Sequence, residues 1–235
     1  MLEYVPTGCQ TIDKILGGGI PSQTISLIYG DAETGKTTLA MQCALNCAKR
    51  GYKTLYVDCD GTFSPQRLSQ MASGALKEVA ELIILMGPTN FLEQTAVIER
   101  LTDYITKSFG LVVIDTITSL YRARVAENPE KTFELNRELN RQVALLAQAA
   151  KTRHIAVLLT SQVRSVLDGA YVDVEPVATR VLKFWASTVI AMKPTENSRV
   201  VKAILEKIPG ENRQSTIHLM MDETGIHEYS TAKRW

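Results

Sequence analysis

Residues 24–42 read TISLIYGDAETGKTTLAMQ, and this stretch decides the fold of the chain. Within it, residues 30–37 fit the pattern G-x-x-x-x-G-K-[ST], which forms a loop between a strand and a helix. The apolar run 24–30 predicts the strand, and residues 35–50 predict the helix. In this context the backbone N–H groups of the loop and the positive end of the helix dipole face the phosphates of a nucleotide.

The residue types of this loop indicate separate roles. Gly30 and Gly35 allow the backbone to turn so that its N–H groups point inward. Lys36 supplies a mobile positive charge for the β and γ phosphates, and Thr37 offers a hydroxyl oxygen to Mg²⁺. We therefore expect ATP and Mg²⁺ as cofactors, with Lys36 acting in catalysis as well. The expected nucleotide-binding residues of the loop are Gly30, Asp31, Ala32, Glu33, Thr34, Gly35, Lys36, Thr37 and Thr38.

Polar residues end three other predicted strands. The run GLVVID, residues 110–115, places Asp115 at the carboxyl end of a buried strand, where it could hold Mg²⁺ together with Thr37. In YVDCDG, residues 56–61, either Asp58 or Asp60 could reach the nucleotide, or each could cap a turn. Gln162 ends the run 154–162 and could contact a γ-phosphate, or it could be an ordinary surface residue.

The whole chain alternates short apolar runs with longer amphipathic stretches. This alternation predicts an α/β fold with a doubly wound, mostly parallel sheet flanked by helices. The predicted strands are 24–30, 53–58, 81–86, 110–115 and 154–162, and the predicted helices are 35–50, 64–74, 91–108 and 130–152. After Gln162 we predict no long helix. Three runs separated by turn residues, 187–193, 199–207 and 215–222, predict a C-terminal antiparallel extension of the sheet. We expect one domain over 1–235.

Composition narrows the possible functions. The 235 residues carry a net charge of +1, so binding to nucleic acid would require a local basic patch. The four cysteines form no C-x-x-C pair and are expected to be small buried side chains rather than zinc ligands. The N-terminus lacks the regions of a signal peptide, and no apolar run approaches the roughly 20 residues that span a membrane. These features favour a cytoplasmic protein.

Taken in order, these motifs resemble the ATPase core of RecA/RadA-type recombinases over essentially the whole chain. The resemblance is closest to the short archaeal paralogues of RadA and implies a RecA-type P-loop NTPase core. The matching stretches are PTGCQTIDKILGGGI (6–20), GDAETGKTTLAMQ (30–42), YVDCDGTFSPQRL (56–68), LVVIDTITSLYR (111–122) and LLTSQVRSVLDG (158–169).

The resemblance implies further roles at the nucleotide. Asp60 stands where the relatives have the acidic residue that activates the attacking water, and Arg67 would lie over the adenine ring. Gln162 would sense the γ-phosphate, so that Lys36, Asp60 and Gln162 are the implied catalytic residues. In the relatives, a cis peptide bond follows the aspartate that corresponds to Asp115. The resemblance therefore predicts a cis bond at Asp115–Thr116.

The resemblance also implies a DNA site. The segments after Asp115 and after Gln162 correspond to the two DNA-binding loops of the relatives. Their basic residues here, each of which could instead be a solvated surface charge, are Arg122, Arg124, Arg164, Arg180 and Lys183. Lys207 resembles a lysine that reaches the nucleotide of a neighbouring subunit.

Several departures distinguish the chain from a full recombinase. The relatives have Glu where this chain has Asp60, and they carry an N-terminal helical DNA-binding domain, whereas the core here begins almost at Met1. No phenylalanine has an alanine three residues later, so the Phe-x-x-Ala hook of filaments is missing. The glycine pair of the second DNA loop is also missing, and Trp185 near its end could stack on a base or pack in the protein.

These features lead to an expected function. We expect a weak Mg²⁺-dependent ATPase that binds ATP and DNA and modulates a RadA-type recombinase or a Holliday-junction resolvase without performing strand exchange. The alternatives are a full strand-exchange recombinase, a hexameric motor or clock-type ATPase of the same fold, and an interaction module with a vestigial site.

Overall fold

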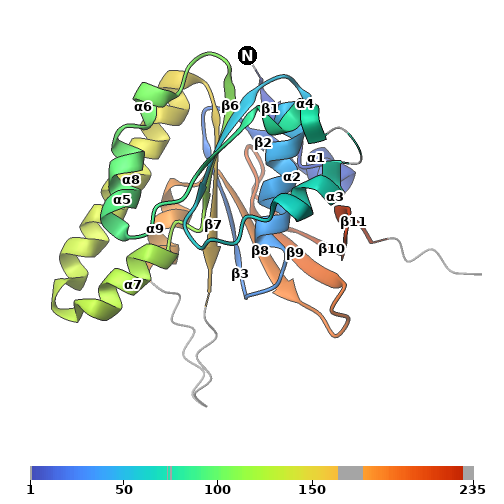
Figure 1. Cartoon of the computed structure of the whole chain (residues 1–235). Helices are drawn as coiled ribbons and strands as arrows, with labels where there is room; N and C mark the ends of the chain where they lie inside the picture. The colour runs from blue at the N-terminus through green and yellow to red at the C-terminus, as the bar shows by residue number, and fades with distance from the viewer. Residues whose placement is uncertain (1, 73, 75, 164–176, 230–235) are drawn as a thin grey trace, which may run out of the picture.

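A nine-stranded sheet runs through the centre of the molecule (Figure 1). The computed structural model describes residues 2–72, 74, 76–163 and 177–229. The strand order is β11-β10-β9-β8-β3-β7-β6-β4-β5. The strands of the parallel part are β3 (Ile25–Gly30), β4 (Lys53–Asp58), β5 (Ile83–Met86), β6 (Phe109–Asp115), β7 (Ala156–Gln162) and β8 (Thr188–Pro194). The antiparallel extension consists of β9 (Val200–Lys207), β10 (Ser215–Asp222) and β11 (Gly225–Glu228). The prediction of a mostly parallel sheet with an antiparallel C-terminal extension is confirmed. The run 187–193 was wrongly assigned to the extension, because β8 pairs parallel with β3, and strand β11 was not predicted.

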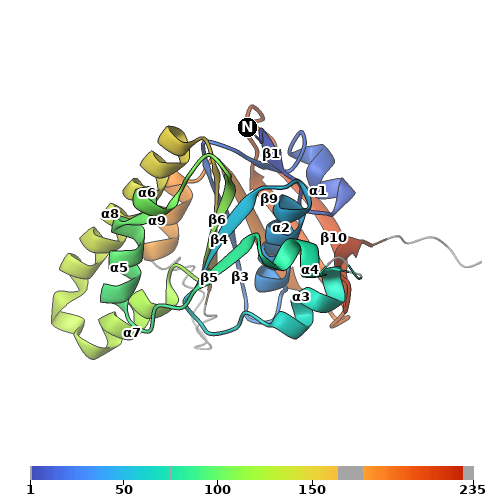
Figure 2. The same ribbon diagram turned by 45° about the horizontal axis from the view of Figure 1, so that its top comes forward.

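Helices cover both faces of the sheet, and Figure 2 shows the two groups on opposite sides. One face carries α1 (Gln10–Ile15), α2 (Lys36–Lys49), α3 (Pro65–Ala72) and α4 (Leu76–Ala80). The other carries α5 (Phe91–Glu99), α6 (Leu101–Tyr104), α7 (Ser119–Glu127), α8 (Thr132–Arg153) and α9 (Val177–Trp185). A two-stranded sheet, β1 (Tyr4–Val5) with β2 (Ile20–Pro21), lies at the N-terminus.

Strand β6 shows why the apolar runs are continuous. Leu111 and Val113 pack in the core on the α2 side, whereas Val112 and Ile114 pack in the core on the α8 side. Successive side chains of a strand point to opposite faces, so a strand covered on both faces needs apolar residues at every position. The extension is covered less completely. On β10, Leu219 is buried whereas its neighbours His218 and Met220 are exposed.

Some predicted boundaries were wrong. The helix predicted over 91–108 is divided at Arg100 into α5 and α6. It also ends earlier than predicted, because the chain leaves helical geometry at Ile105 and turns into β6 at Phe109. The sequence prediction also missed α1, α4, α7 and α9. For α9 a weak signal was present in the sequence, because the apolar residues Ala178 and Leu182 lie four residues apart, and the structure buries both. No helix of the described residues is both long enough and apolar enough to cross a membrane.

Candidate nucleotide-binding site

The loop between β3 and α2 has the backbone that its glycines predict. Gly30 has φ 153°, and a Cβ atom there would lie 1.9 Å from the carbonyl oxygen of Met192 on β8. Gly35 has φ 86° and forms the N-cap of α2. Both positions therefore exclude a side chain, one because a neighbouring strand passes so closely and one because its φ is positive. The N-terminus of α2 opens directly into this loop.

Lys36 lies low in the loop, with 7% of its surface exposed. Its Nζ donates to the backbone carbonyl of Asp31 at 2.5 Å. Burial lowers the pKa of Lys36, and the carboxylates of Asp115, Asp31 and Asp60 oppose that shift. The ammonium group is therefore held where a polyphosphate would have to enter.

Asp115 is fully buried and is surrounded by hydroxyl groups from three elements of structure. Tyr56 on β4 donates to its Oδ2 at 2.6 Å, and Thr160 on β7 donates to its Oδ1. The Thr37 hydroxyl on α2 lies 3.4 Å from the same Oδ1. Burial raises the pKa of Asp115, and the three hydroxyl groups lower it. The peptide bond Asp115–Thr116 is cis, as predicted.

This donor set fits Mg²⁺. The hydroxyl of Thr37 and the carboxylate of Asp115 are hard oxygen ligands that lie close together beside the phosphate loop. Within the described part of the chain, no cluster of three or more His, Cys, Asp or Glu side chains could hold a metal alone. Mg²⁺ usually takes one or two protein ligands and completes its shell with phosphate oxygens and water. Thr37 and Asp115 would therefore hold the ion jointly with a nucleotide.

The two aspartates after β4 have different surroundings. Asp58 is buried and accepts from the backbone N–H groups of Thr62 and Phe63 at 3.1 and 2.9 Å, so both its oxygens close a turn. Asp60 is exposed and lies close enough to Lys36 and Asp115 to shift their pKa values. Of the two, Asp60 is free to meet a nucleotide.

Gln162 ends β7 directly beside Gly30, its partner in the parallel ladder. It also lines a cavity of about 490 Å³ together with Thr116 and Arg122, among others. Its amide therefore lies between the start of the phosphate loop and the helix that carries Arg122. That is a suitable place for a group that contacts a terminal phosphate.

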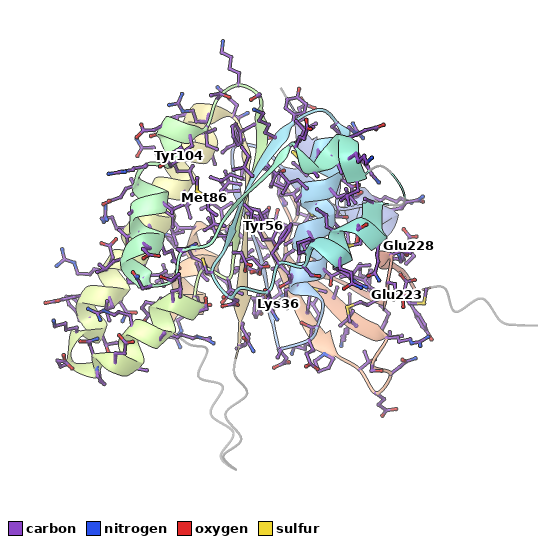
Figure 3. All side chains as sticks on the ribbon, viewed as in Figure 1. Lys36, Tyr56, Met86, Tyr104, Glu223 and Glu228 are labelled. Carbon is purple, nitrogen blue, oxygen red and sulfur yellow. The ribbon has the colours of Figure 1, made fainter. Side chains whose placement is uncertain are left out.

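A C-terminal hairpin forms a wall of the site that the sequence did not predict. Met221 on β10 lies against Gly35, and a Cβ at Gly35 would be 2.9 Å from its Sδ. The Gln42 side chain on α2 accepts from the Ile226 N–H at 2.8 Å and donates to the Ile226 carbonyl at 3.1 Å. Arg67 donates to the backbone carbonyl of Asp222, and Figure 3 shows Glu223 and Glu228 of the hairpin on the side of α1 and α3. Arg67 is thus bound to the hairpin beside the predicted base site.

The predicted DNA-binding residues differ in their surroundings. Arg122 lines the cavity beside Gln162, and Arg124 pairs with Glu127 at 3.1 Å. Lys183 pairs with Glu206 at 3.1 Å and lies over the Tyr29 ring. Arg180 is exposed on α9, and Arg164 lies outside the described residues.

Two further residues singled out in the sequence make contacts within the chain. The indole of Trp185 donates to Asn140 on α8 at 2.9 Å, and its ring packs against the core beneath that helix. Lys207 donates to the carbonyl of Ala186. All four cysteines are buried and unpaired, as expected.

A phosphate loop, a buried carboxylate beside its threonine and a sheet of this strand order define a P-loop core of the RecA-like fold. A model of the Rad51 family matches residues 2–228. The chain is 37% identical over 229 residues to the DNA repair and recombination protein RadB of Thermococcus gammatolerans, covering 95% of this chain and 98% of that one. It is 33% identical to RadB of Methanobrevibacter smithii, with 94% of each chain covered. A crystal structure of the RadB recombinase has a TM-score of 0.81 at 31% identity and covers 97% of this chain and all of that one. The chain belongs to the Rad51 family.

Proposed function

We propose that this protein is an accessory factor of DNA repair and homologous recombination that binds MgATP and DNA and hydrolyses ATP slowly. It acts in the cytoplasm on a RadA-type recombinase or a Holliday-junction resolvase and does not itself catalyse strand exchange. The observation that carries the proposal is the meeting of three groups at one loop. The buried Lys36 ammonium, the Thr37 hydroxyl and the Asp115 carboxylate converge where a strand enters α2.

Slow hydrolysis follows from the length of one side chain. Asp60 carries the charge that would activate water, but it is one methylene shorter than the glutamate at that position in the RecA/RadA-type relatives. A general base must lie within hydrogen-bond reach of the water, and a displacement of about 1 Å can cost about 100-fold in rate. The other parts of the site do not depend on that reach, so ATP binds normally.

DNA binding is supported by two kinds of observation. The curated relatives are named as DNA repair and recombination proteins. Arg122 lines the cavity that also contains Gln162, so a cation for DNA lies beside the residue that would contact the γ-phosphate. ATP binding and DNA binding would thereby influence each other through Gln162.

The test is nucleotide affinity in a pair of lysine variants. Lys36→Ala removes the buried ammonium group of the loop, whereas Lys49→Ala removes an exposed lysine at the other end of the same helix. Calorimetry should give more than a tenfold loss of MgATP affinity for Lys36→Ala, with unchanged far-UV circular dichroism and little loss for Lys49→Ala. Equal affinities of the two variants would overturn the assignment of the site. A continuous filament on single-stranded DNA with strand exchange would restore the full recombinase as the function.

A further inference from the structure

We infer that Tyr56 is a positioning residue that sets both carboxylates of the nucleotide site, Asp115 through its hydroxyl group and Asp60 through its ring. The inference rests on the proposed function, because it concerns how the same site holds Mg²⁺ and water. Figure 3 shows Tyr56 and Lys36 near the centre of the view, where the sheet meets α2. Tyr56 is itself fully buried.

The hydroxyl group of Tyr56 fixes one oxygen of Asp115. It donates to Oδ2 at 2.6 Å, whereas the hydroxyl groups of Thr37 and Thr160 both donate to Oδ1. The carboxylate is therefore held from both sides, with Oδ1 turned toward Thr37. A carboxylate whose orientation is fixed in advance need not reorganise when the metal arrives.

The ring of Tyr56 supports the loop that carries Asp60. Its centroid lies 4.9 Å from that of Phe63, and the two rings meet edge to face at 68°. The N–H groups of Phe63 and Thr62 both bind Asp58 at the end of the same strand. The loop from Asp58 to Phe63 is thus closed on itself and rests on Tyr56, with Asp60 at its exposed part.

A phenylalanine would fill this place in the core without burying a polar group. A tyrosine hydroxyl that is buried needs a partner, and here that partner is the side chain expected to hold Mg²⁺. The two halves of one side chain therefore contact the two parts of the site that must act together. The contact made by each half of the Tyr56 side chain can be removed separately.

The experiment separates the hydroxyl group from the ring. Tyr56→Phe removes only the hydroxyl group, and Phe63→Leu removes only the aromatic contact. Tyr121→Phe is the matched control, because Tyr121 is also a buried tyrosine, with its hydroxyl bound to Asn136 and not to Asp115. ATP affinity is measured by calorimetry over a series of Mg²⁺ concentrations and without Mg²⁺, and kcat is measured at saturating MgATP.

For Tyr56→Phe we expect the Mg²⁺ concentration that gives half-maximal enhancement of ATP binding to rise about fivefold or more. Its Mg²⁺-free ATP affinity should match that of the wild type and of Tyr121→Phe. For Phe63→Leu we expect an unchanged Mg²⁺ dependence and a kcat lowered severalfold, because only the Asp60 loop is loosened.

Each contrary outcome has its own meaning. An unchanged Mg²⁺ dependence in folded Tyr56→Phe would overturn the role of the hydroxyl group. A Phe63→Leu variant with wild-type kcat would overturn the role of the ring, and this arm decides even if Tyr56→Phe does not fold. A wild-type protein whose ATP binding does not respond to Mg²⁺ would instead overturn the proposed function.

Discussion

Asp60 and Asp58 are separated by one residue, yet the fold gives them opposite surroundings. Both oxygens of Asp58 accept hydrogen bonds from backbone N–H groups, so that carboxylate serves to close a turn. Asp60 is exposed toward the phosphate loop, where its charge is felt by Lys36 and Asp115. Strand alternation alone could not decide between them, because the strand ends at Asp58 and the chain turns there.

We predict that Asp60→Glu raises kcat for ATP hydrolysis about tenfold or more. The added methylene restores reach to the attacking water, and only the transition state gains from it. ATP affinity should therefore stay nearly unchanged. Steady-state ATPase assays and calorimetry on the same preparation measure the two quantities.

The control for this prediction is Asp58→Asn. An asparagine has one acceptor oxygen, so one of the two N–H groups that Asp58 binds would face the NH₂ group instead. We expect a lower melting temperature, with catalysis reduced only as far as the turn loosens. If Asp60→Glu left kcat flat while Asp58→Asn abolished it in a folded protein, Asp58 would be the base.

At the scale of elements, the Gln42 side chain of α2 holds the hairpin β10–β11 by hydrogen bonds. Gln42 pairs with both backbone groups of Ile226, much as a neighbouring strand would. Gln42→Leu would leave both groups buried without partners, at about 1–3 kcal/mol each. We expect the melting temperature to fall by several degrees and the affinity for ATP to fall with it, since Met221 would no longer be held against the loop. The exposed Gln148→Leu on α8 should change neither.

A second element-scale prediction concerns charge on the antiparallel extension. Lys202 on β9 lies directly opposite Lys193 on β8. Like charges directly opposite each other destabilise a sheet by a few tenths of a kcal/mol. Lys202→Glu should therefore raise the melting temperature by about 1–2 °C. The gain should shrink in 1 M salt, and a gain that persists there would mean that repulsion is not its source.

At the scale of the whole molecule, net charge limits how the protein can bind DNA. The formal charge is +1, so attraction must come from few local cations. We predict that two to four ions are released on duplex DNA, with a slope of roughly −0.9 for each phosphate contact. Fluorescence anisotropy at several salt concentrations measures this slope.

Reversing Arg122 and Arg124 to Glu should weaken DNA binding equally on all sequences. Reversing Lys49 and Arg50, which end α2 far from the phosphate loop, changes the net charge by the same amount. If both double variants lost the same affinity, net charge rather than a local site would govern binding. If the first variant bound as tightly as the wild type, the segment after Asp115 would not be the DNA site.

Sequence reasoning found the parts of the site that are local in the chain. The phosphate loop and Asp115 were predicted from short patterns, and the parallel sheet from buried apolar runs. The cis bond after Asp115 was predicted only from the resemblance to the relatives. The wall formed by Met221 and the buried partner Tyr56 could not be predicted this way. Their roles come from contacts between residues far apart in sequence, and a methionine or tyrosine in an apolar run carries no local sign of such a contact. Gln42 gave a weak sign, because it is a polar residue on the buried side of α2.

The hairpin also sets an order of events during synthesis. Gln42 and Ile226 are 184 residues apart in the chain. The phosphate loop therefore leaves the ribosome long before the β10–β11 hairpin has been synthesised. Under the proposed function, we predict that a nascent chain acquires its nucleotide only after nearly all of the protein has been made. Stalled chains released after residue 214 should fail to retain ATP on a desalting column, whereas full-length chains retain it. Bound nucleotide would then report that translation is complete.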